Sequence, residues 1–391
     1  MSLHRRAAIV GVHEFERRQA PDRSILQIQA ECAQKALAEA GLSLRDVDAI
    51  YTPSSEGMSL PSMIGLIQAE YLNIHPRVID STSVGGASFL FHAHHAAAMI
   101  AAGDCEVALI TYGSTALSQA VAIGTRGVSG DKAPPVPDSF EVPYGITTIG
   151  LYAIVAQRHM YQYGTTSEQL AEIAVVTRKH ASLNPLAMFR DPITIADVLK
   201  SRMVSSPLHV LDCCIISDGG GAVVMTSAKR ARTLKKPPVY FLGGCEAASH
   251  GDAGMRELTD VAAKYSGEVA LKRAGVTHKD IDVACVYDSF TITVLTTLED
   301  LGFCKKGQGG AFVQGGRIAL GGELPLNPDG GGLSSCHPGM RGIFLLIEAT
   351  KQLRGESGLR QVKDARTALC HGTGGSLGAR HSGCTVILGA E

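Results

Sequence analysis

The sequence predicts an α/β protein built from two similar halves, in which most strands run parallel. Three observations in the 391-residue chain carry this prediction. Runs rich in β-branched residues alternate with helical patterns, which is typical of parallel sheets covered by helices. Residues 36–48 are echoed by residues 270–282. A strand that runs into a glycine turn at residues 108–113 is echoed at residues 368–372.

The first repeat predicts the same local structure in both copies. Each copy reads as a helix that ends at a glycine, Gly41 or Gly275. Glycine takes a positive φ without strain, so it commonly follows the last helical residue. A short polar turn and a hydrophobic strand come next in both copies. We therefore interpret the two halves as a duplication.

The boundary between the halves is expected in the basic stretch 229–238, which ends in two prolines. This places the N-terminal half at residues 1–236 and the C-terminal half at residues 237–391. Residues 118–205 have no counterpart in the second half and read as an inserted loop domain with an amphipathic helix at 167–180. Insertions of this size commonly carry a substrate site or an oligomer contact.

Composition excludes several classes of function. The chain has 36 basic and 37 acidic side chains, so no basic field for nucleic acid is expected. Its longest apolar stretches, 96–102 and 105–110, are far shorter than the roughly 20 residues that span a bilayer. The basic residues 1–6 lead into a short strand instead of a signal sequence. We expect a cytoplasmic protein without a membrane span.

Neither a metal site nor a bound cofactor is expected. The ten cysteines form no Cys-x-x-Cys pair, and in a reducing compartment most of them read as small buried hydrophobic residues. The adjacent Cys213 and Cys214 have no matching cluster of further ligands. The three histidines His92, His94 and His95 share one helix without an acidic neighbour in sequence, so packing or an interface explains them better.

Five short motifs, four of them containing glycine, occur in order along the chain, at residues 84–88, 217–224, 287–290, 327–339 and 370–375. Each motif alone is weak, but their order and spacing resemble the thiolase superfamily, and most closely its sterol-carrier and lipid-transfer branch. The resemblance covers nearly the whole chain. It implies a duplicated thiolase fold, with two mixed five-stranded sheets in a layered α/β sandwich and an inserted loop domain.

The resemblance also exposes a missing residue. A thiolase cysteine takes up the acyl group from the amino end of a helix, where the helix dipole favours the thiolate. That position falls on Gly86, and residues 79–92 contain no cysteine. Ser83 is a possible substitute nucleophile, but it would need a base nearby. Gly86 therefore argues against an ordinary acyl-enzyme mechanism.

Two further positions retain reactive side chains. The resemblance places His337 at the family's catalytic histidine, although the glycine turn after it is one residue shorter. Tyr287 stands where thiolases have asparagine or histidine, and a phenol can act as a base or as a donor to an oxyanion. A tyrosine without the cysteine is similar to the steroid side-chain-cleaving aldolases. Those enzymes carry a second tyrosine at the position of His337, so the match is partial.

The last motif contains two candidates for the family's acid/base position, Cys370 and His371, because the alignment can slip by one residue. His371 would serve as a proton shuttle and Cys370 could face the core. The remaining thiol, Cys336, reads as a small residue in a turn. The resemblance also implies a set of substrate-binding residues, Gly86, Ser88, Asn327 and Gly374.

The favoured activity is retro-aldol cleavage of a 3-hydroxyacyl-CoA without a covalent acyl-enzyme, with coenzyme A thioester as the substrate. Two alternatives stay open: an acetyl-CoA acetyltransferase or thiolase that uses Cys336 or Cys370, and a non-catalytic subunit that binds acyl-CoA or lipid. The resemblance further implies a homodimer and a small zinc-ribbon and OB-fold partner protein associated with acyl-CoA.

Overall fold

A single sheet of nine strands forms the centre of the computed structural model, which describes residues 2–54, 63–120, 147–250 and 255–391. The strand order is β3-β2-β4-β7-β1-β8-β11-β10-β9. The strands are β1 (Ala7–Glu14), β2 (Ala49–Tyr51), β3 (Val78–Asp80), β4 (Val107–Ser114), β7 (Gly219–Ser227), β8 (Val239–Ser249), β9 (Val283–Val286), β10 (Thr367–Gly375) and β11 (His381–Gly389). The first five in this order belong to the first half of the chain and the other four to the second.

The α/β class is confirmed, but the prediction of two five-stranded sheets was wrong in count. The expectation that most strands run parallel was also wrong, because five of the eight pairings in the large sheet are antiparallel. The halves are joined edge to edge, because β1 and β8 pair through Ala8 with Tyr240 and Ile9 with Val239. This junction is short, so each half keeps the strand pairings of its own sheet.

The expected fifth strand of the second half is reduced to one bridge between Ala284 and Leu326. Pro325 precedes the bridge and has no N–H to donate to a neighbouring strand. Asn327 follows it with a φ of 47°, which turns the chain away from the sheet. Pairing therefore ends after a single residue.

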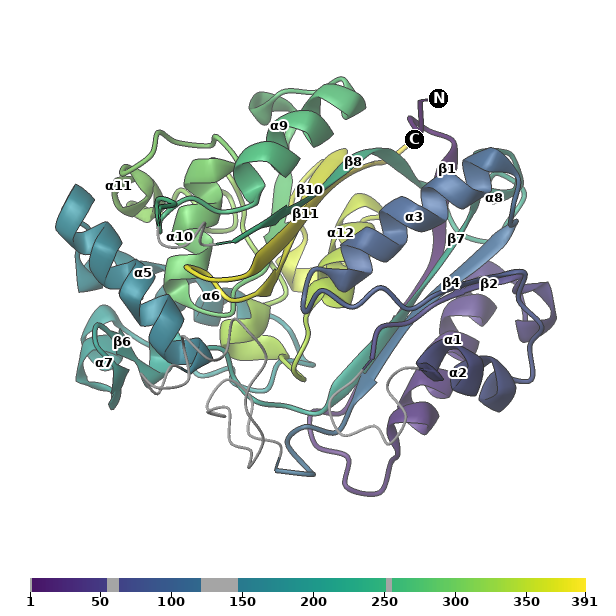
Figure 1. Cartoon of the computed structure of the whole chain (residues 1–391), viewed down its shortest axis with the longest axis horizontal. Helices are drawn as coiled ribbons and strands as arrows, with labels where there is room; N and C mark the ends of the chain where they lie inside the picture. The colour runs from purple at the N-terminus through teal and green to yellow at the C-terminus, as the bar shows by residue number, and fades with distance from the viewer. Residues whose placement is uncertain (1, 55–62, 121–146, 251–254) are drawn as a thin grey trace.

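Two helices lie between the two halves of the sheet, and the repeated helices cover the outer faces of these halves (Figure 1). The inner helices, α3 (Ser88–Ala102) and α12 (Gly342–Leu353), contact each other and share one hydrophobic core. The outer helices α1 (Ile25–Ala40) and α9 (Ala263–Ala274) are the duplicated pair. They end at Gly41 with φ 77° and Gly275 with φ 71°, as the sequence predicted.

The insertion lies between β4 and β7 and is mainly helical. It contains α5 (Thr148–Tyr163), α6 (Ser167–Ser182), α7 (Ile195–Lys200) and a small hairpin of β5 (Met203–Ser205) with β6 (Leu208–His209). The predicted amphipathic helix is confirmed as α6, which begins at a capping box between Thr166 and Gln169. The insertion's residues 121–146 lie outside the described part of the chain.

The remaining helices complete the outer layers: α2 (Ile64–Leu72), α8 (Ala228–Ala231), α10 (Thr291–Asp300) and α11 (Gly309–Val313). The boundary proposed between residues 236 and 237 falls between α8 and β8. Among the residues placed in the structure, no helix has the length and apolar character needed to cross a bilayer.

Candidate active site

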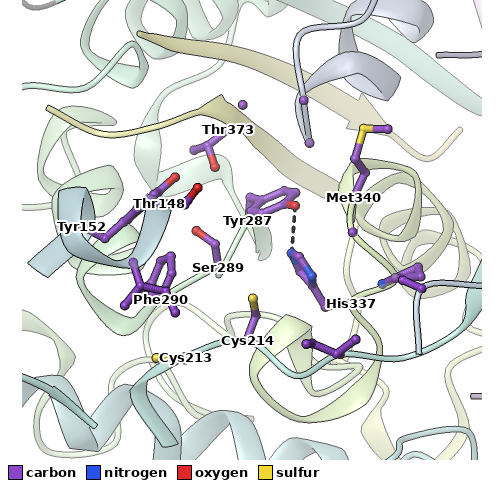
Figure 2. A pocket seen from close by; sticks show the side chains of 18 of the residues that line it. Thr148, Tyr152, Cys213, Cys214, Tyr287, Ser289, Phe290, His337, Met340 and Thr373 are labelled. Atoms are coloured by element: carbon purple, nitrogen blue, oxygen red, sulfur yellow. Dashed lines mark hydrogen bonds between the residues drawn. The ribbon is translucent and has the colours of Figure 1, made fainter. Parts of the chain in front are cut away.

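A pocket of about 750 Å³ opens where the two halves and the insertion meet. Its walls come from the turn before α3, the end of β4, the start of α5, the turn after β9 and the end of β10. Figure 2 shows Tyr287 and His337 on one side of this pocket, with Thr148, Tyr152, Ser289 and Phe290 on the other. Three parts of the chain that are distant in sequence therefore build one site.

Tyr287 follows β9 directly and is the central side chain of the pocket. Its backbone N–H donates to the carbonyl of His371 over 2.9 Å, which fixes the start of the turn. A hydrogen bond of 2.9 Å joins its hydroxyl to Nε2 of His337. The side chain is 5% exposed, and burial raises the pKa of the phenol well above its usual value. Tyr287 is therefore a neutral phenol at neutral pH.

His337 lies in the loop between the π-helical turn Gly331–Ser335 and α12. Its backbone N–H donates to Oγ of Ser217 over 3.0 Å, and its Nε2 faces the tyrosine hydroxyl. Burial, and next to it the positive charge of Arg341, lower the pKa of the imidazole to about 4. The ring is thus neutral at neutral pH and has a nitrogen able to accept a proton.

Gly86 is the residue that makes room for this tyrosine. A Cβ atom at Gly86 would lie 2.1 Å from Cε2, 2.4 Å from Cζ and 2.6 Å from the hydroxyl oxygen of Tyr287. Real side chains do not approach this closely. The aromatic ring therefore occupies the space that a cysteine side chain would need, so the missing nucleophile and the tyrosine are two parts of one arrangement.

The other residues predicted to bind substrate have different positions. Gly374 lines the pocket, and a Cβ there would lie 1.6 Å from the carbonyl oxygen of Val84, so only glycine fits. Ser88 does not line the pocket; its hydroxyl accepts from the N–H of Val84 and donates to the carbonyl of Gly85, which holds the turn before α3.

Asn327 also lies outside the pocket lining, and its side chain bonds to the backbone of the residue that precedes Tyr287. Its side-chain amide accepts from the N–H of Val286 over 2.7 Å and donates to the carbonyl of the same residue over 2.8 Å. Val286 is the last residue of β9, immediately before Tyr287. The asparagine thus makes the pair of backbone hydrogen bonds that a neighbouring strand would make, and these bonds fix the end of β9.

His371 and Cys370 lie on β10 and neither lines the described pocket. The His371 ring lies on the side of β10 opposite to Cys370, where its Nδ1 bonds to Oγ1 of Thr385 over 2.8 Å. Burial lowers the pKa of the His371 imidazole to about 3. Cys370 faces the inner core and donates to the carbonyl of Leu345 over 3.5 Å. This placement does not support the proton-shuttle prediction for His371, and Cys370 faces the core, as one of its two predicted readings had it.

Cys336 is also buried away from the pocket, in contact with Ser217 at 3.5 Å. The thiols that line the pocket are Cys213 and Cys214, and burial raises the pKa of both. In Figure 2 the sulfur of Cys214 points into the space between Ser289 and His337. Sequence reasoning considered this pair only for metal binding and missed its place in the pocket.

The pocket residues that were not predicted include Tyr152, Ser289, Phe290 and Thr373. Three of them lie within motifs recognised in the sequence, so proximity to Tyr287 and Gly374 was a usable signal. Tyr152 comes from α5 of the insertion and packs on Phe290 with ring centroids 4.4 Å apart. Nothing in the sequence shows that this helix turns toward the pocket.

Two of the three histidines of α3, His94 and His95, have acidic partners from other elements, whereas His92 contacts the carbonyl of Thr82. His94 contacts Glu246 at 2.6 Å, and His95 contacts Asp80 at 2.6 Å and Glu246 at 3.1 Å. These ion pairs join α3 to β3 and β8. In the described part of the chain, no group of His, Cys, Asp or Glu side chains has the arrangement of a metal site.

The duplicated fold and a pocket built over the amino end of α3 define a thiolase-like enzyme, modified by a tyrosine in the nucleophile's space. Residues 244–390 match the family model "Thiolase C-terminal domain-like". The chain is 35% identical over 398 residues to a steroid side-chain-cleaving aldolase of Thermomonospora curvata, covering 98% of both. It is 33% identical over 389 residues to an acetyl-CoA acetyltransferase of Methanothermobacter thermautotrophicus, covering 96% of this chain and 97% of that one.

A solved structure of an Ltp2-ChsH2(DUF35) aldolase superposes with a TM-score of 0.88 at 32% identity, over 99% of this chain and 98% of that chain. The chain therefore belongs to the thiolase superfamily, in its lipid-transfer and aldolase branch. Membership of this branch confirms the resemblance found in the sequence.

Proposed function

We propose that this enzyme cleaves the Cα–Cβ bond of a 3-hydroxyacyl-CoA by a retro-aldol reaction without an acyl-enzyme. The observation that carries the proposal is the hydroxyl of Tyr287, hydrogen-bonded to a neutral His337 in the space above Gly86. The similarity of this chain to an aldolase over nearly its whole length supports the same reaction. The CoA thioester is the substrate, and the reaction needs no bound cofactor.

The Tyr–His pair supplies a path for one proton. The substrate β-hydroxyl gives its proton to the oxygen of Tyr287, while the phenol passes its own proton to Nε2 of His337. The electron pair of the O–H bond becomes the new carbonyl, the Cα–Cβ bond breaks, and its electrons form the thioester enolate. The proton then returns through Tyr287 to the α-carbon. The products are a ketone or aldehyde and a shortened acyl-CoA, with no net change in the enzyme.

The surroundings of the pair suit this charge movement. Gly85 and Gly86 line the pocket just before α3, whose amino end favours the negative charge of an enolate. Arg202 lies in the described lining, on an exposed segment next to β5, and it suits the phosphate groups of coenzyme A. The pocket therefore offers a site for the reacting carbons and a cation for the other end of the substrate.

The direct test is to incubate the purified enzyme with 3-hydroxyacyl-CoA esters of different chain structure and identify products by mass spectrometry. We expect equal amounts of a carbonyl compound and a shortened acyl-CoA, and no acyl group on the intact protein. The same ester without its 3-hydroxyl is the control and should not be cleaved. Trapping of an acyl group on a thiol, with Cys214 the thiol that faces the pair, would instead establish the acyltransferase alternative.

The pH dependence follows from the environment of His337. Its pKa is lowered to about 4, so the ring is able to accept a proton at any pH above that value. As pH falls through about 4, protonation removes the acceptor and kcat/KM should fall about tenfold per pH unit. A pH–rate profile of the cleavage checks this. An acid limb near the ordinary histidine pKa of about 6.5 would contradict the lowered pKa of His337.

We also propose that the protein acts in the cytoplasm as a homodimer, together with a small zinc-ribbon and OB-fold partner. The ten cysteines, all free, fit a reducing compartment. The Ltp2-ChsH2(DUF35) aldolase, which this chain resembles over its full length, supports the partner. Light scattering of the purified chain tests the dimer. Full activity of the chain alone, without copurification of such a protein, would refute the partner.

A further inference from the structure

One fully buried cation, Arg341, contacts the chain next to both members of the Tyr–His pair. It is 0% exposed and lies directly before α12. Its Nη1 donates to the carbonyl of Cys336 over 2.9 Å, and its Nη2 donates to the carboxylate of Asp329. Its Nε lies 3.3 Å from Oδ1 of Asp288.

Two of these partners, Cys336 and Asp288, are immediate neighbours of the reacting side chains in sequence. Cys336 precedes His337, and Asp288 follows Tyr287. The guanidinium group therefore contacts the backbone of the residue before His337 and the side-chain carboxylate of the residue after Tyr287.

Asp288 extends the connection to the turn that leads into His337. Its carboxylate accepts from the N–H of Gly332 over 2.7 Å and from the N–H of Leu333 over 3.2 Å. Both donors belong to the π-helical turn Gly331–Ser335. The end of β9 and the histidine loop are thus joined through one carboxylate and one guanidinium group.

We propose that Arg341 is a positioning residue that holds the hydroxyl of Tyr287 at hydrogen-bond distance from Nε2 of His337. The inference deepens the retro-aldol function and rests on it. Arg341 touches neither the pocket nor the reacting atoms, so it acts through the two residues that it aligns.

The energetics of burial favour this role over a purely stabilising one. Removing charges from water is costly, and buried ion pairs can often be replaced by apolar residues without loss of stability. Catalytic geometry has a stricter requirement, because a displacement of about 1 Å can cost roughly 10²-fold in rate. A rigid, forked guanidinium group with two hydrogen-bonded nitrogens and a third at ion-pair distance from Asp288 meets that requirement better than apolar packing.

The charge of Arg341 acts on the pair as well. It lowers the pKa of His337 in addition to burial, and it lowers the pKa of Tyr287 against the larger effect of burial. The acidic groups that face it are Asp288, whose pKa burial raises to about 6, and Asp329. Loss of the arginine charge should therefore move the acid limb of the pH–rate profile upward from about 4.

The test compares Arg341→Met and Arg341→Lys with the matched control Arg360→Met. Arg360 is a buried arginine that pairs with Glu348 of α12 at 3.0 Å and does not line the pocket. We expect Arg341→Met to lower kcat by about 10²-fold with KM little changed, and to move the acid limb upward. Arg341→Lys should restore part of kcat and the wild-type acid limb. Arg360→Met should lower Tm while kcat and the acid limb stay as in the wild type.

Equal kcat and equal acid limbs in the Arg341→Met and Arg360→Met variants would overturn the proposal and leave Arg341 a structural residue. If Arg341→Met does not fold, Asp288→Asn and Arg341→Lys decide the question by the same two readouts. Tyr287→Phe is measured in parallel. If that variant keeps the wild-type rate, the retro-aldol function itself fails, whereas its loss of activity with an unaffected Arg341→Met rejects only the positioning role.

Discussion

Replacing Tyr287 by phenylalanine is expected to lower kcat for cleavage by about 10²- to 10⁴-fold. In the proposed reaction the phenol receives the substrate proton, and its hydroxyl is hydrogen-bonded to His337. Phenylalanine keeps the ring that fills the space above Gly86, so the fold and the pocket shape should survive. Steady-state kinetics with a cleavable 3-hydroxyacyl-CoA, together with Tm, measure the effect.

The matched control for this variant is Tyr51→Phe. Tyr51 is buried on β2 and does not line the pocket. This control should leave kcat unchanged. If Tyr287→Phe, in the complete assembly with any partner protein, is as active as the control, the chain is a scaffold or binding subunit and not the catalyst.

Replacing Gly86 by alanine should have the second large effect. The new methyl group would lie 2.1 Å from Cε2 of Tyr287, so the ring must leave its position or the turn before α3 must shift. Overpacking of this kind costs about 1–3 kcal/mol of stability. Because the ring carries the hydroxyl proposed to transfer the proton, we expect kcat to fall by about 10²-fold as well.

A double-mutant cycle with Tyr287→Ala tests the cause of the Gly86→Ala effect. Without the aromatic ring the methyl group has room, so Gly86→Ala should cost little further stability in that background. Urea unfolding of the four proteins measures the coupling free energy. Equal destabilisation in both backgrounds would show that the backbone of the turn, and not the tyrosine ring, excludes a side chain at this position. By the same reasoning, Gly86→Cys alone should not create a thiolase.

Much of the fold could be predicted because local signals determine it. The duplicated helix ends at Gly41 and Gly275 follow from glycine's access to positive φ, and α6 follows from apolar periodicity and a capping residue. The number of sheets could not be predicted. It depends on a short pairing between β1 and β8 and on the turn at Asn327, and neither leaves a pattern in the sequence.

The candidate site divides in the same way. The sequence by itself determined that Gly86 cannot be acylated and that Tyr287 and His337 stand at two motif positions. Only the tertiary structure decided that the Tyr287 ring fills the space above Gly86 and that the two side chains are joined. The structure also shows that His371 and Cys370 lie on opposite sides of β10, because successive residues of a strand face opposite ways. A one-residue shift in the alignment therefore exchanges the sides predicted for these two residues. Motif order is a property of the chain, whereas the direction of a side chain depends on the packing of distant segments.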